Sequence, residues 1–208
     1  IAPDETSMSL NAKCYEAGLA SFAELVGELK SDSVRPAEQG SEKNRYDAEK
    51  RPAALGAFDF TKPAADLDRL VRALDFGAYA NPLGAAKLWT GKAVSLVGSL
   101  TIQEGSASNA PGHVVALDDA GITISASDHD VTLGAFRCLK GEPRHPNAVG
   151  LQVGAQIPPL PALSDEEMTT IAKAELYWQD ALANAQPLQS PYPSNRDTAA
   201  GATAVPVP

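Results

Sequence analysis

The sequence is short of the residues that several classes of function require. Lysine and arginine together number 17 against 26 aspartates and glutamates, which leaves a net charge of −9 at pH 7. Binding a phosphate backbone or an anionic lipid surface depends on clustered basic side chains, so this balance argues against both partners. No apolar run approaches the roughly 20 residues that span a bilayer. Residues 1–4 also lack the basic start and apolar core of a signal peptide.

Cysteine is equally scarce, since the chain holds only Cys14 and Cys138. The two residues lie far apart in different predicted elements and show no metal-binding spacing. We therefore expect two buried thiols, no metal site and a reducing, cytoplasmic environment. Aromatic residues make up only 6% of the chain, whereas 16 prolines and 16 glycines indicate a good deal of loop around the core.

Motifs for nucleophilic or nucleotide chemistry are missing as well. The sequence has no Gly-x-Ser-x-Gly elbow and no phosphate-cradling glycine loop. Asp128-His129-Asp130 places three potential ligands together, but neighbouring strand residues point to opposite faces, so we expect a solvated turn. We expect His113 at a strand edge and His145 in a loop without a partner. Trp89 fits barrel packing better than ligand stacking in so acidic a chain.

The first segment has the pattern of a helix. Residues 4–7 supply capping side chains and negative charge, and Gly18 and Gly27 leave open whether one helix or two kinked helices follow. An amphipathic stripe of this kind needs a partner, and we expect its packing surface to lie upstream of Ile1. The stripe consists of Leu10, Cys14, Ala17, Ser21, Leu25 and Leu29.

A second helix is predicted after residue 60, with Thr61 as its cap, Pro63 in its first turn and a buried face of Leu67, Leu70, Val71 and Leu74. Short apolar runs with turn signals between them then predict an antiparallel barrel or sandwich rather than a βαβ sheet. These runs are 94–97, 100–102, 113–117, 121–126 and 131–134.

A proline-rich, extended connector is predicted over residues 152–163. Ser164 and Glu167 form a capping box that starts a last helix. Apolar residues along that helix are Met168, Ile171, Ala172, Leu176, Trp178 and Leu182.

The predicted fold class is α+β, with a helical segment and a linker helix before a small antiparallel β-barrel, and a connector and C-terminal helix after it. We divide the chain into a helical segment (1–36), a polar linker (37–60), the helix and barrel (61–146), the connector and helix (147–193) and a disordered tail (194–208).

Five motifs occur in the order and spacing of one enzyme family. They resemble the C-terminal half of methionyl-tRNA formyltransferases and their tetrahydrofolate-dependent relatives. The motifs are Ile1–Thr6, Phe58-Asp59-Phe60, Val71-Arg72-Ala73, Ala110-Pro111-Gly112-His113-Val114, and Gly121–Ile124 with the turn at 128–130.

This resemblance implies that the barrel is OB-like and that residues 1–36 close a catalytic domain. The catalytic Asn, His and Asp of the family, and its cofactor 10-formyltetrahydrofolate, belong to the upstream catalytic half. We therefore expect no catalytic, cofactor-binding or metal-binding residue here, and no formyl transfer by this piece alone.

The loop Asn81-Pro82-Leu83-Gly84 and the final segment through Pro193 look like formyltransferase-like modules of nonribosomal peptide synthetases. That resemblance implies an aminoacyl acceptor on a carrier protein, a place in antibiotic biosynthesis, and a downstream synthetase module as partner. Tyr177, Trp178 and Tyr192 are candidate docking residues, and packing of Tyr177 and Trp178 onto the barrel is the other interpretation of that pair. The alternative is a non-catalytic scaffold that spaces neighbouring domains.

Overall fold

The computed structural model describes residues 1–36, 38, 51–77, 79 and 84–183. The chain divides into two compact units, Ile1–Ala174 and Glu175–Pro208. Most of the predicted linker, the loop residues Asn81–Leu83, Tyr192 and the predicted tail lie outside the described residues.

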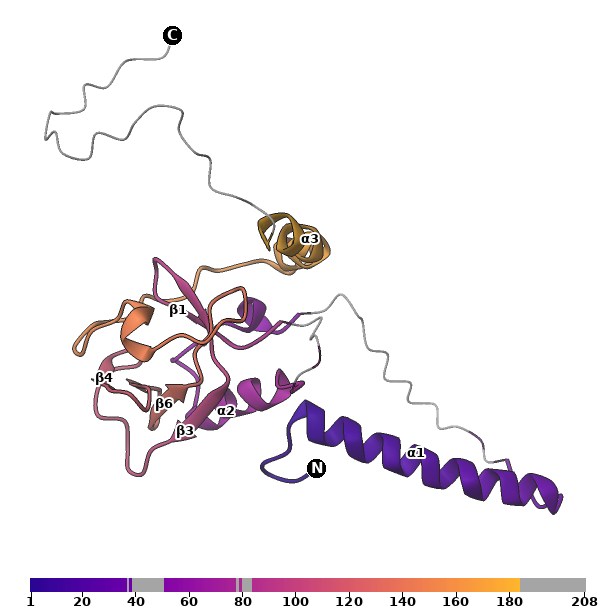
Figure 1. The fold of residues 1–208 in the computed structure, drawn as a ribbon. Helices are drawn as coiled ribbons and strands as arrows, with labels where there is room; N and C mark the ends of the chain where they lie inside the picture. Colours follow the sequence, from indigo (N-terminus) through magenta and orange to yellow (C-terminus); the bar gives the residue numbers. More distant parts are fainter. Residues whose placement is uncertain (37, 39–50, 78, 80–83, 184–208) are drawn as a thin grey trace, which may run out of the picture. The chain divides into compact units, whose positions relative to one another are not determined.

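The predicted α+β class is confirmed, with helices and two antiparallel sheets in a small, open, barrel-like domain (Figure 1). The smaller sheet pairs β1 (Lys87–Trp89) with β2 (Val94–Leu96). The larger one has the order β3-β6-β5-β4, and its strands are β3 (Ser99–Ile102), β4 (Val114–Leu117), β5 (Ile122–Ser125) and β6 (Asp130–Gly134). Each predicted run overlaps one of the strands β2 to β6, whereas β1 was not predicted.

Alternation along the strands decides which side chains form the core. Ile122 lies opposite Leu133 and Ile124 opposite Val131, and all four side chains are fully buried. Between them Thr123 lies opposite Thr132, and their hydroxyls hydrogen-bond at 2.9 Å on the other face of the sheet. Because successive strand residues point to opposite faces, the same two strands provide an apolar inner face and a polar outer one.

The helix α2 (Ala64–Ala73) buries Leu67 and Val71 against this core, as its spacing predicts. The prediction that Thr61 caps it is wrong. The Thr61 hydroxyl donates to Asp59, and the N-cap position is held by Pro63, which has no side-chain acceptor. The Ala64 N–H instead donates to Asp128 Oδ1 at 2.8 Å, so a residue 64 positions away caps the helix.

The connector after the barrel is hydrogen-bonded to β4 and contributes a side chain to the core. The Val114 N–H donates to the Ala155 carbonyl and the Ile157 N–H to the Gly112 carbonyl, both at 2.9 Å. Ile157 is buried in the core together with Val149 of the short helix η2 (Pro146–Val149). The first part of the connector therefore covers the outer edge of β4.

Both terminal helices begin where the capping residues predict. The first, α1 (Ser7–Lys30), is a single helix with Thr6 at its N-cap and a reciprocal bond to Ser9. The last, α3 (Asp165–Ala183), starts with the Ser164–Glu167 capping box, whose hydrogen bonds hold the pKa of Glu167 below its usual range. Neither glycine of α1 produces a kink.

Two further features of the first unit differ from expectation or are unusual. Cys14 is exposed and Cys138 only half-buried, so the prediction of two buried thiols is wrong; Cys14 lies on α1, which has no buried residue. The short helix η1 (Ala53–Gly56) contains Ala54 and Leu55 in the left-handed region, with φ of 49° and 57°. L-residues adopt this conformation at a cost.

Candidate interaction site on the first helix

The most exposed apolar surface of the described residues lies along α1. Tyr15, Leu19 and Phe22 are 69%, 73% and 65% exposed, and Leu29 is 63% exposed. Together with Val26, they follow one another at intervals of four, three, four and three residues, which places them in one row along a helix. Domains rarely expose apolar side chains in such a row, so this row, the α1 row, is a candidate interaction surface.

The sequence interpretation missed the α1 row. It followed a different stripe, of which Leu10 is half-buried while Cys14 and Leu25 are exposed. The two sets adjoin along the helix and share Leu29, and the remaining strip of the helix carries Lys13, Glu16 and Glu24. The regular spacing from Tyr15 to Leu29 was the signal that could have identified the second set.

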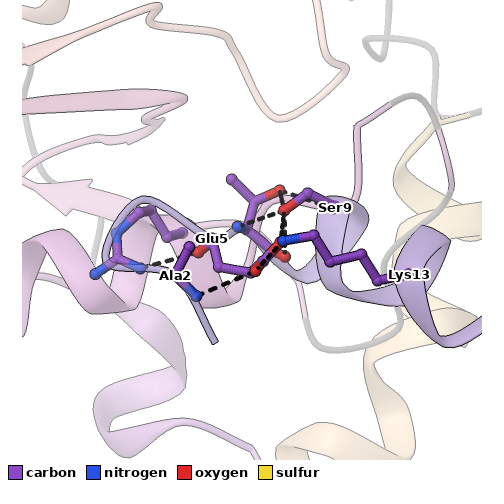
Figure 2. A network of polar contacts seen from close by, with 6 residues as sticks. Ala2, Glu5, Ser9 and Lys13 are labelled. Carbon is purple, nitrogen blue, oxygen red and sulfur yellow. Dashed lines mark hydrogen bonds and ion pairs between the residues drawn. The ribbon is translucent and has the colours of Figure 1, made fainter.

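The start of α1 is fixed by a compact polar network around Glu5 (Figure 2). The Glu5 carboxylate accepts from Lys13 Nζ and the Ser9 hydroxyl, both at 2.7 Å, and from the Ala2 N–H at 3.2 Å. These hydrogen bonds, that from Lys13 foremost, lower the pKa of Glu5 to about 2. The carboxylate therefore stays ionised at physiological pH and holds residues 2–13 in one arrangement.

Asp128 and Asp130 point to different parts of the protein and do not form a joint ligand site. Asp128 caps α2, and the Ala64 N–H lowers its pKa. Asp130 is buried and accepts from Ser108 and from the Ser125 hydroxyl. The segment is thus more than a solvated turn, because both carboxylates hold distant parts of the chain in place.

His129 lies beside Asp128 and helps to lower the pKa of that carboxyl group. Its Nδ1 lies 3.3 Å from Asp128 Oδ2, and its side chain is partly exposed. In the part of the chain that the structure describes, no three His, Cys, Asp or Glu side chains converge as a metal site would require.

The remaining single candidates lie apart from one another. His113 bridges to Gln156 at the edge of β4, where an edge residue was expected. His145 has partners, contrary to expectation: its Nδ1 accepts from the Asn147 N–H, and its Nε2 lies 3.3 Å from Asp119 Oδ1. Trp89 is half-buried in β1.

In the second unit, the candidate docking residues Tyr177 and Trp178 are exposed, at 68% and 55%. Their rings meet edge to face with centroids 5.3 Å apart. This pair offers apolar contact area on α3. None of the described helices is both long and apolar enough to cross a membrane.

The barrel-like domain and the helix before it are similar to parts of known proteins. Residues 52–147 match the family model for the formyl transferase C-terminal domain. Methionyl-tRNA formyltransferase of Myxococcus xanthus (strain DK1622) is 33% identical over 137 residues, which are 64% of this chain and 40% of that protein. The methionyl-tRNA formyltransferase of Burkholderia mallei (strain ATCC 23344) is 33% identical over 132 residues, 62% of this chain and 37% of that protein.

The chain spans about two fifths of the length of these relatives. The matched region begins before the first core aromatic, Phe58, and ends within η2, so it contains α2 and the strands β1 to β6 of the described residues. Residues 52–147 of this chain are therefore similar to the formyl transferase C-terminal domain, and the resemblance extends to methionyl-tRNA formyltransferases.

Proposed function

We propose that this chain is the C-terminal part of a formyltransferase module that uses 10-formyltetrahydrofolate, and that its barrel positions the acceptor. The observation that carries the proposal is the uncovered α1 row beside a formyltransferase C-terminal domain. In this arrangement an upstream catalytic half covers the α1 row and performs the chemistry.

The size of the α1 row fits a permanent intramolecular interface. Fully burying a large apolar side chain contributes about 1.5–3 kcal/mol. Tyr15, Leu19, Phe22 and Leu29 each expose more than 60% of their surface and can each contribute on this scale. Their row is as long as the last four turns of α1, which suits contact with a folded domain better than contact with a single peptide.

The buried polar groups of the described barrel do not fit a folate. Ser95 is hydrogen-bonded to Arg144, and Ser125 and Asp130 are bonded to each other. A pterin ring requires donors and acceptors that are free to receive it, and these groups are committed to the protein itself. We therefore assign the cofactor to the upstream half and derive no chemical step in this chain.

For the acceptor, we propose an aminoacyl group tethered to a carrier protein of a nonribosomal peptide synthetase. The names of the relatives refer to methionyl-tRNA. This chain has a net charge of −9, however, and a tRNA backbone favours a basic surface. The exposed Tyr177 and Trp178 pair is available to contact the next module or the carrier.

The test joins this chain to its own upstream half and supplies 10-formyltetrahydrofolate with either an aminoacyl carrier protein or an aminoacyl-tRNA. We expect mass spectrometry to find the formylated aminoacyl group on the carrier, and no transfer with this chain alone. Formylation of tRNA only would overturn the acceptor assignment.

If neither acceptor is formylated and the upstream half lacks the catalytic Asn, His and Asp, the chain is a scaffold that spaces neighbouring domains. The Tyr177 and Trp178 pair would then be its main docking feature.

A further inference from the structure

Two helices that are far apart in sequence meet end to end. The Met8 N–H, in the first turn of α1, donates to the Asp75 carbonyl just beyond α2 at 3.0 Å. The Ser7 hydroxyl donates to the Ala73 carbonyl, in the last turn of α2, at 2.6 Å. The beginning of α1 therefore lies against the end of α2.

This meeting satisfies groups that both helices would otherwise leave open. The first N–H groups and the last carbonyls of a helix have no partner within the helix. Here the end of α2 accepts from the start of α1. The helix dipoles favour this contact as well, because the negative C-terminal end of α2 faces the positive N-terminal end of α1.

Arg72 strengthens the same contact from α2. Its Nη1 donates to the Glu5 carbonyl at 2.9 Å, while its Nε donates to Asp68 at 2.8 Å on its own helix. The guanidinium fork is thus held in position on α2 and reaches the residue that precedes the α1 cap. Because the side chain of Glu5 is bound to Lys13 and Ser9, the bond to Arg72 restrains the whole first turn of α1.

Gly77 makes the close approach possible. Its φ is +61°, and an added Cβ would lie 3.3 Å from Met8 Cγ. A larger residue would therefore be strained in its backbone and crowded against α1.

We propose that this junction is a rigid mount that sets the position of α1 relative to the barrel, with Arg72 as its positioning residue. This inference rests on the proposed function for its biological meaning. If α1 belongs to the interface with the catalytic half, the mount fixes how far the formyl donor lies from an acceptor held at the barrel.

The first experiment needs only the present chain. Spin labels are placed on Cys14 of α1 and on Leu139→Cys, an exposed barrel position, in a Cys138→Ser background. Pulsed electron resonance then gives the distribution of distances between them. We expect one narrow distance, its loss in Arg72→Ala, and its retention in Arg69→Ala.

Arg69→Ala is a matched control because Arg69 lies on the same helix and, among the described residues, pairs with Asp66 and the Ala65 carbonyl, away from α1. A second variant, Ser7→Ala, removes the hydrogen bond from the Ser7 hydroxyl to the Ala73 carbonyl and leaves the sequence of α2 unchanged. It should broaden the distance distribution less than Arg72→Ala does. A broad distribution in the unaltered chain, or one that Arg72→Ala leaves narrow, overturns the mount.

The second experiment adds the upstream half. For Arg72→Ala we expect a lower kcat and a higher KM for the acceptor, with an unchanged KM for 10-formyltetrahydrofolate. The kinetic constants of Arg69→Ala should equal those of the unaltered protein. A general loss of folding would change both KM values. If the distances behave as expected but no formyl transfer is found for any variant, the proposed function fails and the mount stands.

Discussion

The helices α1 and α2 differ in how far the rest of the chain covers them. The shorter one, with 10 residues, buries Ala64, Leu67 and Val71 in the core. The longer one, with 24 residues, buries none, although it carries more large apolar side chains. The comparison teaches that local capping is enough to start α1, whereas the burial of a helix depends on a partner surface. For α2 that surface is the barrel; for α1 we assign it to the upstream half.

The largest difference should appear in a pair of leucine truncations. Leu133→Ala removes a fully buried side chain from β6 and should lower the free energy of unfolding by about 2–5 kcal/mol. Leu19→Ala on α1 should change it by no more than about 0.5 kcal/mol, because Leu19 is exposed. Urea unfolding followed by tryptophan fluorescence measures both. A large loss for Leu19→Ala in this chain would show that α1 already has a partner within it.

A second large effect is expected at Asp130, which has no counterpart on α1. Asp130→Ala leaves the buried Ser125 hydroxyl without its acceptor and should cost about 1.5–3 kcal/mol. Asp119→Ala, at an exposed position of the β4–β5 turn, is the control and should cost far less. Equal losses for the two variants in urea unfolding would contradict the structural role of Asp130.

The same residue predicts a dependence on pH. Burial acts to raise the pKa of Asp130, but the hydrogen bonds from Ser108 and Ser125 outweigh it and lower the pKa. Its contribution to stability is therefore complete above its ordinary value of 3.8 and is lost as the pH falls through the lowered pKa. Asp130→Asn should flatten this part of the stability profile between pH 5 and the acid limit, as measured by urea midpoints.

A smaller gain is expected at the left-handed turn before α2. Ala54→Gly relieves a φ of 49° and should stabilise the protein by about 1 kcal/mol or less, since glycine also adds freedom to the unfolded chain. Ala53→Gly, at an exposed neighbour without positive φ, should be neutral or destabilising. Thermal unfolding measures the stability of both variants. A lower stability of Ala54→Gly would show that the backbone strain at Ala54 does not limit the stability of the protein.

The smallest effect should be confined to the first turn of α1. The pKa of Glu5 is about 2, below its ordinary 4.5, so its network is complete above about pH 4.5 and is lost as the pH falls towards 2. Glu5→Gln should raise hydrogen exchange at the Thr6 and Ser9 amides at neutral pH and leave the urea midpoint of the barrel unchanged. An unchanged exchange rate would mean that the network does not hold α1.

The sequence predicted the strands from residue 94 onward, because alternation between Ile122, Ile124 and their polar neighbours is a local signal, but it did not predict β1. It failed where the partner is distant. The local pattern points to Thr61 as the cap of α2, because Asp128 is 64 residues from Ala64 and no local pattern connects the two. The exposure of Cys14 and of the α1 row depends on which surface packs against the helix. The spacing of Tyr15, Leu19 and Phe22 identifies the row but does not identify the surface that covers it.

The strand-like connector has a consequence for anyone who shortens the chain. A protein ending at residue 147, the limit of the matched domain, would lose the Ala155 carbonyl that pairs with β4 and the Ile157 side chain that closes the core. The bare edge of β4 would then offer its backbone to a neighbouring molecule. Such a protein should form aggregates through edge-to-edge pairing, while one that extends to residue 160 should stay monomeric.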